Sequence, residues 1–242
     1  MKNMTSQRSA AVARTEPQDV GHDTDLHRSA VPQPQTPFRT PSRLPGLLHT
    51  STWTYAVMLV FSGIALLVSF ILSAETLELA RHPKQLLSCD INSVLSCSAV
   101  AQSWQAEIIK FGTLSYPNAF FGIAAESVFI VIAVLGLVQI RVPRWFATLT
   151  WFGGLLALLY AYWLFTQSVF VIRALCPWCL VLMFSTTFQF MALSHATVTV
   201  QDIPHKSGPL SYYRLHYDLM VDVVVFVVLA GIILVKDGAA IF

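Results

Sequence analysis

Residues 176–193 read CPWCLVLMFSTTFQFMAL, two cysteines at the head of a long apolar run. As an α-helix rising about 1.5 Å per residue, this run nearly crosses a hydrocarbon core of roughly 30 Å. Cys176 and Cys179 then lie one turn apart on one face. Unpaired N–H groups and the positive dipole end at a helix start favour thiolate. We therefore predict a redox-active pair, with a structural disulfide or half of a metal site as alternatives.

The composition places the whole chain in the membrane class. Of its 242 residues 55% are hydrophobic and 12% are charged, whereas soluble proteins carry about 25% charged residues. Backbone groups in lipid are satisfied by helices, so the sequence predicts an all-α integral membrane protein. A net charge of +2 without a basic cluster argues against a nucleic-acid partner. Five transmembrane helices are predicted, over residues 53–72, 116–138, 148–171, 176–193 and 219–235.

Residues 1–50 differ in kind from the rest of the chain. They contain six of the twelve prolines and no apolar run, so they cannot bury enough surface to offset the entropy of ordering. We predict a disordered tail. Placing the tail in the cytoplasm puts ten of the fifteen Lys and Arg residues on that side, as the positive-inside rule favours. The other predicted domains are a four-helix bundle over 51–195, with an extracytoplasmic loop over 73–115, and a cytoplasmic loop with a fifth helix over 196–242.

A second cysteine pair, Cys89 and Cys97, falls in the polar loop after the first span. Two spans separate the two pairs, so the chain crosses the membrane twice and all four cysteines lie on the same side. With the tail inside, that side is extracytoplasmic, where disulfides persist. Taken alone, the loop pair favours a structural bridge. Next to a membrane C-x-x-C pair, it indicates a relay in which a loop thiol attacks a buried disulfide.

The segment after Cys97 carries apolar residues at helical spacing, namely Val100, Trp104, Ile108 and Phe111. This stripe predicts an amphipathic helix that lies in the membrane interface. Two interpretations stay open for it. The helix is either a lid over a pocket among the spans or a loop helix that only packs.

Glu126 lies near the middle of the second span. An ionisable group at that depth is costly and therefore indicates a function. It either relays a proton to a bound ligand or lies protonated in a helix contact. Gly153 and Gly154 in the third span have a simpler interpretation, because small residues let membrane helices approach closely.

Four motifs follow one another along the chain, namely Cys89-Asp90-x6-Cys97, Ser103 six residues later, Pro117-Asn118-x3-Gly122, and Cys176-Pro177-Trp178-Cys179. Their order and spacing resemble the vitamin K epoxide reductase family over roughly residues 53–194. The five-span layout is similar to the bacterial branch of that family. The resemblance implies a four-helix bundle around a quinone, menaquinone or ubiquinone, with a fifth helix outside it, in a bacterial inner or cell membrane.

The resemblance also implies a direction of electron flow. Bacterial members reoxidise a secreted thioredoxin-like protein that makes disulfides in exported proteins. By position, Cys89 is similar to the cysteine that meets this partner, and Cys97 to the cysteine that attacks the C-x-x-C disulfide at Cys176. Cys179 is similar to the cysteine beside the quinone.

Three further residues are predicted to contact the quinone. Ser103 and Asn118 match family positions that shape or polarise the quinone site, and Glu126 is added although it matches no family feature. The chain ends at Phe242 without a thioredoxin-like domain after the fifth span, which implies a separate extracytoplasmic partner. The residues after Cys179 lack the Thr-Tyr feature of the animal enzymes, so we expect quinone reduction rather than epoxide reduction.

Three alternatives come from other functional classes. A non-catalytic membrane scaffold would hold two stable disulfides, and a metal-binding membrane protein would use four thiolates for tetrahedral zinc. A reductase of exported disulfides would run the relay backwards, but no cysteine lies on the cytoplasmic side to bring electrons. The expected function is therefore a quinone-dependent, disulfide-generating oxidoreductase with no resident metal, which draws on the membrane quinone pool.

Overall fold

The structure is a computed structural model that describes residues 50–83, 86–111, 114–140, 142–201 and 217–241. The predicted tail up to residue 49 and the predicted cytoplasmic loop over 202–216 lie outside the described residues. Within the described ranges the chain is largely helical, and five helices are long and apolar enough to cross a membrane. The prediction of an all-α, multi-pass membrane protein is confirmed.

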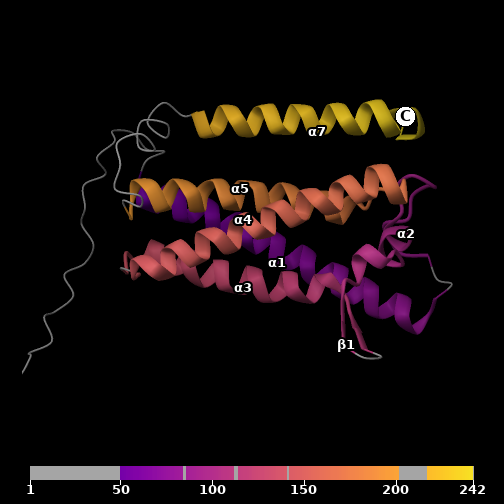
Figure 1. The fold of residues 1–242 in the computed structure, drawn as a ribbon, viewed down its shortest axis with the longest axis horizontal. Helices are drawn as coiled ribbons and strands as arrows, with labels where there is room; N and C mark the ends of the chain where they lie inside the picture. The colour runs from indigo at the N-terminus through magenta and orange to yellow at the C-terminus, as the bar shows by residue number, and fades with distance from the viewer. Residues whose placement is uncertain (1–49, 84–85, 112–113, 141, 202–216, 242) are drawn as a thin grey trace, which may run out of the picture. The chain divides into compact units, whose positions relative to one another are not determined.

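Each predicted span corresponds to one long helix (Figure 1). The first helix continues well beyond the apolar span, into the segment that carries Glu75. The long helices are α1 (Ser51–Arg81), α3 (Asn118–Leu137), α4 (Arg144–Gln167), α5 (Pro177–Thr199) and α7 (Tyr217–Ile241). The short elements are α2 (Cys97–Ala101), the 3-10 turn η2 (Trp104–Ala106), the strands β1 (Ile109–Phe111) and β2 (Leu114–Tyr116), and the π-helical turn η3 (Ser168–Ile172).

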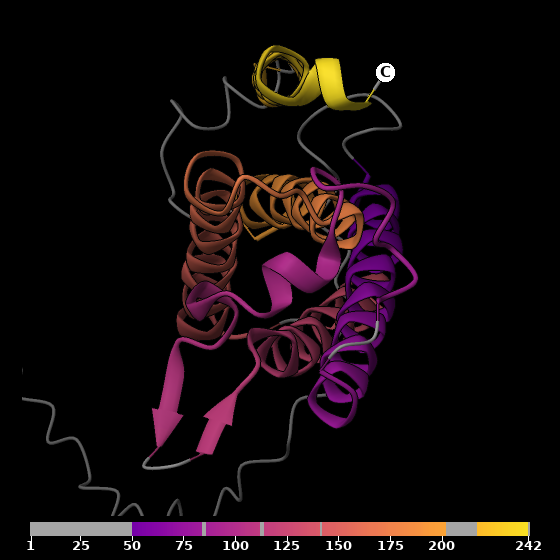
Figure 2. The same cartoon turned by 90° about the vertical axis from the view of Figure 1, so that its right-hand side faces the viewer.

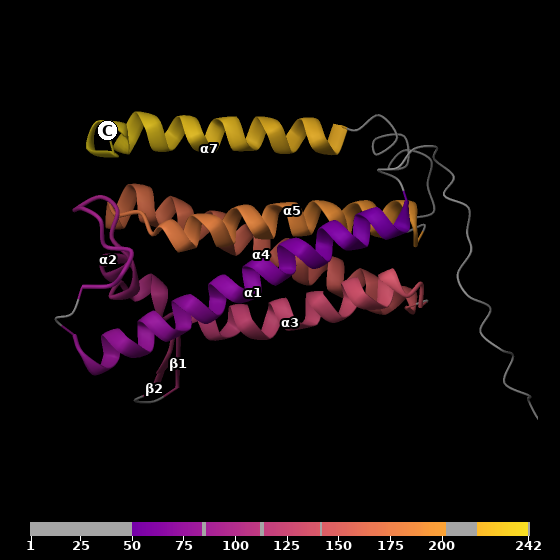
Figure 3. The same cartoon turned by 180° about the vertical axis from the view of Figure 1, so that it is seen from behind.

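Helices α1, α3, α4 and α5 form a bundle. Helix α1 packs against both α3 and α5, and α4 packs against α5 (Figure 3). Near the start of α1, the bundle core contains Tyr55 and Met58, which pack with Phe129 and Ile132 of α3 and Leu193 of α5. Burial of these large side chains holds this end of the bundle together.

Glycines at positions 136 and 154 permit close approaches between helices. A Cβ atom at Gly136 would overlap the ring of Tyr55, so α3 can lie this close to α1 only with glycine there. A Cβ at Gly154 would lie 2.9 Å from Cδ2 of Leu193, whereas a Cβ at Gly153 would meet no atom within 4 Å among the described residues outside its own stretch of helix. The predicted packing role of the glycine pair therefore applies to Gly154 and not to Gly153.

Helix α7 contacts the outer side of α4 and α5. Leu229 is buried in a cluster with Phe165 of α4 and Met183 of α5. The ring of Phe226 lies 5.0 Å from the ring of Phe184, centroid to centroid. A fifth helix next to a four-helix bundle is the arrangement that the resemblance implied.

The predicted amphipathic helix over residues 100–111 is wrong. Helix α2 ends at Ala101, because the hydroxyl and the backbone N–H of Ser103 both donate to the carbonyl of Val100, at 2.6 and 3.1 Å. Strand β1 then pairs with β2 in antiparallel register, with Ile109 opposite Tyr116. A stripe of four apolar residues fits a helix, but adjacent β-branched residues such as Ile108 and Ile109 favour a strand. Figure 2 shows α2 lying across the end of the bundle.

Candidate redox site

Backbone hydrogen bonds fasten the loop before α2 to the segment before α5. The N–H of Leu175 donates to the carbonyl of Val94 at 2.7 Å, and the N–H of Ser96 donates to the carbonyl of Leu175 at 3.0 Å. Leu95 and Leu175 thereby form an isolated parallel β-bridge. Cys97 lies two residues after Leu95, and Cys176 comes directly after Leu175. The bridge therefore brings the two cysteine pairs together.

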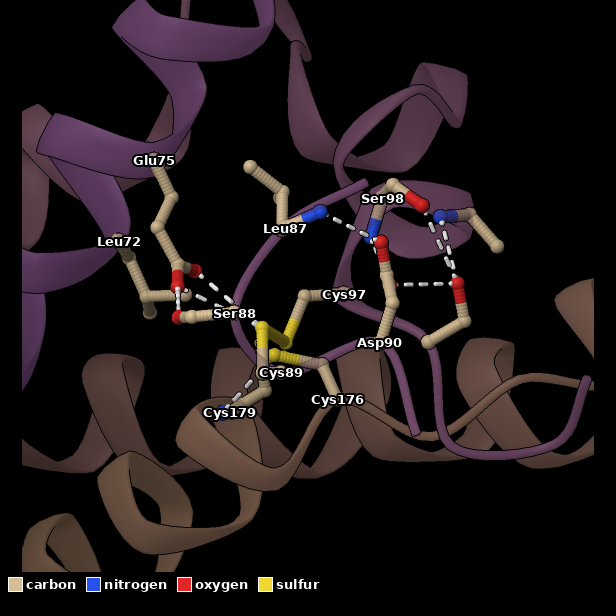
Figure 4. The surroundings of a disulfide bond; sticks show 12 residues. Leu72, Glu75, Leu87, Ser88, Cys89, Asp90, Cys97, Ser98, Cys176 and Cys179 are labelled. Atoms are coloured by element: carbon tan, nitrogen blue, oxygen red, sulfur yellow. Dashed lines mark hydrogen bonds between the residues drawn. A yellow bond between two sulfur atoms is a disulfide. The ribbon is translucent and has the colours of Figure 1, made fainter. Parts of the chain in front are cut away.

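All four cysteines gather in one cluster at this end of the bundle (Figure 4). Cys89 and Cys97, here called the loop pair, are joined by a disulfide. Cys176 and Cys179, here called the helix pair, are free thiols. Cys89, Cys97 and Cys176 are buried together with Leu87. The structure thus brings both pairs to the same end of the bundle, where they pack against each other.

The helix pair occupies the start of α5, as predicted. Cys176 is the N-cap residue, and its Sγ accepts a hydrogen bond from the backbone N–H of Cys179 at 3.2 Å. Pro177 takes the first helical position, where a missing N–H costs no hydrogen bond. The sulfur of Cys176 therefore satisfies one of the N–H groups that every helix start leaves unpaired.

Asp90 holds the loop pair in its conformation. Its carboxylate accepts hydrogen bonds from the backbone N–H groups of Leu87 (2.8 Å) and Ser98 (3.0 Å) and from the hydroxyl of Ser96 (2.8 Å). Burial raises the pKa of Asp90, but these hydrogen bonds outweigh burial and lower the pKa to about 2. The ionised carboxylate thus ties together the two ends of the loop that carries the disulfide.

The two sulfurs of the loop pair line different hollows. Cys89 lines an apolar surface groove of about 220 Å³, together with Pro177 and Trp178. Cys97 lines a cavity of about 420 Å³ among the helices, together with Cys176 and Cys179 of the helix pair. Cys89 is therefore placed at the surface groove, and Cys97 is placed at the cavity that it shares with the helix pair.

The cavity has the character of a site for an apolar ligand with a few polar groups. Ligand pockets are typically about 300–1,000 Å³, mostly apolar, with a small number of placed polar side chains. Apolar walls suit the ring and tail of a quinone, and polar side chains suit its oxygens, so the residues present fit this cofactor. The apolar lining includes Leu72, Val100, Phe121, Leu156, Leu164 and Met183, and the polar lining includes Ser103, Asn118 and Glu126.

Two of the predicted cofactor-contacting residues have defined hydrogen bonds at the cavity wall. The hydroxyl of Ser103 donates to the carbonyl of Val100, so it can offer a cavity ligand only its acceptor lone pairs. The side-chain amide of Asn118 donates to the backbone carbonyl of Gln105. That bond uses one amide hydrogen and fixes the side chain, whose second amide hydrogen can serve a ligand.

Glu126 takes part in a helix contact and also lies at the cavity wall. It is buried, hydrogen-bonds the side chain of Gln189 on α5, and also lines the cavity. Its Oε2 atom has no hydrogen-bond partner among the described residues. The side chain therefore forms a helix contact and at the same time presents a carboxyl group at the cavity.

Two polar residues near the cysteines were missed by the sequence analysis. Gln105 is only 2% exposed, lines the cavity, and donates from its side-chain amide to Gln167 on α4 at 3.4 Å. Glu75 on α1 has its carboxylate oxygens 3.4 and 3.5 Å from Sγ of Cys89. Gln105 falls between the apolar positions of the predicted helix over 100–111, where a polar side chain would be expected at the surface. The available signal for Glu75 was a charged residue a few positions beyond an apolar span.

The structure also bears on the alternative of a metal site with four thiolates. Glu75, Cys89 and Cys97 bring three potential ligand atoms within 4.8 Å of one another. However, Cys89 and Cys97 form a disulfide, and metals bind the thiolate form of cysteine. While this disulfide is intact, the loop pair therefore does not supply two of the four thiolates that the metal site would need.

The comparisons with known proteins agree with the geometry. No curated protein matches the chain. The model of the vitamin K epoxide reductase family matches residues 56–194, which is more than half of the chain. The matched range includes both cysteine pairs, the short helix across the end of the bundle, and the side chains that line the cavity. The chain therefore belongs to the vitamin K epoxide reductase family.

Proposed function

We propose that this protein is a membrane thiol:quinone oxidoreductase that reoxidises a separate, thioredoxin-like protein outside the cytoplasm. Family membership implies quinone-linked disulfide redox activity in a membrane and a quinone-type cofactor. The proposal adds the direction of electron flow, the dithiol partner, and the extracytoplasmic placement of all four cysteines in a bacterial cell membrane. The observation that supports it best is that the loop disulfide lies between the surface groove and the cavity.

The first exchange starts in the groove. A thiol sulfur of the reduced partner loses its proton and bonds to Sγ of Cys89, the Cys89–Cys97 bond breaks, and the electron pair leaves on Cys97. The second thiol of the partner then attacks its own sulfur in the mixed disulfide. This releases the oxidised partner and leaves both cysteines of the loop pair reduced.

The second exchange moves the electrons to the helix pair in its oxidised form. The thiolate of Cys97 attacks Cys176, and the electron pair of the Cys176–Cys179 bond leaves on Cys179. Cys89 then attacks Cys97, which restores the loop disulfide and leaves Cys176 and Cys179 as thiols. The structure has this arrangement, with the loop pair oxidised and the helix pair reduced.

The cavity is where the helix pair would be reoxidised. A quinone held there would supply an acceptor for two electrons and two protons, and the apolar lining suits the tail of menaquinone or ubiquinone. Asn118, fixed by the carbonyl of Gln105, would orient an oxygen of the ligand. Glu126 would hold a proton at the cavity wall, and Ser103 would accept from a hydroxyl of the reduced ligand.

The proposal is tested by following quinone absorbance. The protein in lipid nanodiscs is mixed with a reduced thioredoxin-like dithiol protein and a soluble quinone. We expect the wild type to consume the quinone, and Cys176→Ala and Cys179→Ala to show only the rate of the mixture without enzyme. Gly153→Ala, on the open face of α4, is the matched control and should keep the wild-type rate. Quinone consumption by Cys179→Ala at the wild-type rate would refute the electron path.

A scaffold held by two stable disulfides is supported less well. That alternative requires Cys176 and Cys179 to be joined, but they are free thiols that line the cavity. Detection of a permanently oxidised helix pair in cells would reverse this preference.

A further inference from the structure

Glu75 lies beside the loop disulfide, and none of the steps above uses it. Its Oε2 and Oε1 atoms lie 3.4 and 3.5 Å from Sγ of Cys89 (Figure 4). The hydroxyl of Ser88 donates to Oε1 at 2.9 Å. Because the sulfur of Cys89 carries no hydrogen in the disulfide, it does not donate to the carboxylate. The position of the carboxylate is therefore set by α1 and Ser88, and it is held against the sulfur that the groove exposes.

A carboxylate at this place changes which form of a thiol can approach. Thiolate is the nucleophile in disulfide exchange, but a negative charge next to Cys89 repels it. An ordinary thiol has a pKa of about 8.5, so near neutral pH most of it is protonated and uncharged. The neutral thiol can approach Cys89 without repulsion, and it must lose its proton as it attacks.

The other ionisable groups around Glu75 do not provide this proton acceptor. The Asp90 carboxylate on the loop and the Cys179 thiol at the start of α5 both interact electrostatically with Glu75. Asp90 is already held by the N–H groups of Leu87 and Ser98, and Cys179 lines the cavity rather than the groove. Neither group carries a positive charge that would attract a thiolate. Among these three groups, Glu75 is the one placed at the attacked sulfur.

We propose that Glu75 accepts the proton of the incoming thiol in the exchange at Cys89. As the sulfur of the thiol bonds to Sγ of Cys89, its proton passes to the carboxylate of Glu75. The Cys89–Cys97 bond breaks, and its electron pair leaves on Cys97. A carboxylate, a thiol and a disulfide thus become a carboxylic acid, a mixed disulfide and a thiolate, so atoms and charge balance. This role rests on the proposed function, because the dithiol partner supplies the thiol.

The test follows the first exchange alone. Full-length protein carrying Cys176→Ala and Cys179→Ala stops the electrons at the loop pair, and dithiothreitol serves as the incoming thiol. The appearance of thiols at Cys89 and Cys97 is followed by the mass shift on maleimide labelling between about pH 5.5 and pH 9, a range that includes the thiol pKa. The variants are Glu75→Gln and Glu75→Asp. Glu78→Gln is the matched control, since Glu78 lies three residues further along α1 and faces His82.

We expect the rate for Glu75→Gln to fall about tenfold per pH unit below the thiol pKa, as for attack by free thiolate alone. With Glu75 present the pH profile is shallower, so near pH 6 the protein with Glu75→Gln should react at least about tenfold more slowly. Glu75→Asp keeps a carboxylate and should restore part of the rate, and Glu78→Gln should match the parent protein. An intact loop disulfide and an unchanged melting temperature show that each variant is folded.

Two outcomes would overturn the role of Glu75. A faster reaction of Glu75→Gln at every pH would mean that the carboxylate only repels thiolates. Superimposable pH profiles of Glu75→Gln and the parent protein would mean that Glu75 takes no proton. In that case Ser88→Ala, which removes only the hydrogen bond to Oε1 of Glu75, should also leave the rate unchanged. A loop disulfide that resists dithiothreitol in all proteins would instead contradict the proposed function itself. A defect confined to the Glu75 variants leaves that function intact.

Discussion

Leu95 and Leu175 pair through their neighbouring backbone groups, although two membrane helices separate them in the chain. The pairing is an isolated bridge with one hydrogen bond on each side, at 2.7 and 3.0 Å. It sets the approach of the loop pair to the helix pair, since Cys97 lies two residues after Leu95 and Cys176 comes directly after Leu175. The proposed electron path between the pairs would therefore depend on very few main-chain contacts.

Ser96→Pro should slow exchange between the two pairs. Proline removes the N–H that donates to Leu175, and it cannot adopt the φ of −143° that Ser96 has. Ser96→Ala is the control, because it keeps the N–H and loses only the hydroxyl contacts, namely the helix cap and the hydrogen bonds with Asp90 and Ser98, at a cost of about 1 kcal/mol for the cap. The measurement is the yield of the trapped Cys97–Cys176 disulfide in protein carrying Cys89→Ala and Cys179→Ala. Equal yields would show that the bridge does not control the approach.

Acid should loosen the loop that carries the disulfide. The pKa of Asp90 is lowered from 3.8 to about 2 in the folded protein, so the folded state favours the ionised carboxylate more than the unfolded state does. The stability it adds is fully present above about pH 4 and is lost as the pH falls toward 2. Hydrogen exchange at the amides of Leu87 and Ser98, corrected for intrinsic rates, should show protection falling over this range.

The variant Asp90→Asn supplies the control for that acid effect. It removes the ionisable group, so its protection at the two amides should be low at neutral pH and nearly constant down to pH 2. A wild-type protein that keeps full protection at about pH 2 would contradict the role of the carboxylate.

Filling the cavity should separate quinone reduction from the thiol chemistry. Ala157 on α4 lines the cavity, and Ala157→Phe places a ring in the space that the ligand would use. We expect a higher KM for quinone and an unchanged single-turnover rate for reduction of the loop disulfide. Leu159→Phe, at an exposed position of the same helix, is the control. An unchanged KM for Ala157→Phe would place the quinone elsewhere.

The glycine contacts predict opposite effects for two similar substitutions. Gly136→Ala forces its Cβ into the ring of Tyr55 and should destabilise the bundle by about 1–3 kcal/mol. Gly153→Ala meets open space, so it should be neutral or slightly stabilising, because alanine is the better helix former. Unfolding in mixed micelles measures both free energies. A stable Gly136→Ala variant would mean that α1 and α3 can move apart without cost.

The sequence predicted those features that depend on local pattern or on chain connectivity. Apolar length located the spans, and an even number of spans between the cysteine pairs placed Cys89 and Cys176 on one side whatever the orientation. Ser103 and Asn118 came from the resemblance alone, because no rule of spacing singles them out. The structure places both at the cavity.

The remaining features depend on contacts between segments that are distant in the chain. Gln105 is buried where it meets Gln167 of α4, and Glu75 lies beside the loop disulfide because the loop returns Cys89 to α1. Neither contact leaves a periodic signal. The error over residues 100–111 has a different cause, since four apolar residues fit more than one kind of backbone and Ser103 ends the helix locally.

The loop disulfide lies between the groove and the cavity, with Cys89 at the groove and Cys97 at the cavity. It therefore separates the two spaces and, under the proposed function, would also carry electrons between them. A small thiol arriving from the groove side meets Cys89, whereas the helix pair lines the cavity on the other side. Two electrons would pass from the groove side to the cavity side only when the Cys89–Cys97 bond breaks, and the bond would then form again. Under the proposed function, this arrangement would keep other thiols from reducing the quinone directly. Because one sulfur of the bond lies at each space, only molecules that can undergo thiol–disulfide exchange at Cys89 would deliver electrons to the quinone.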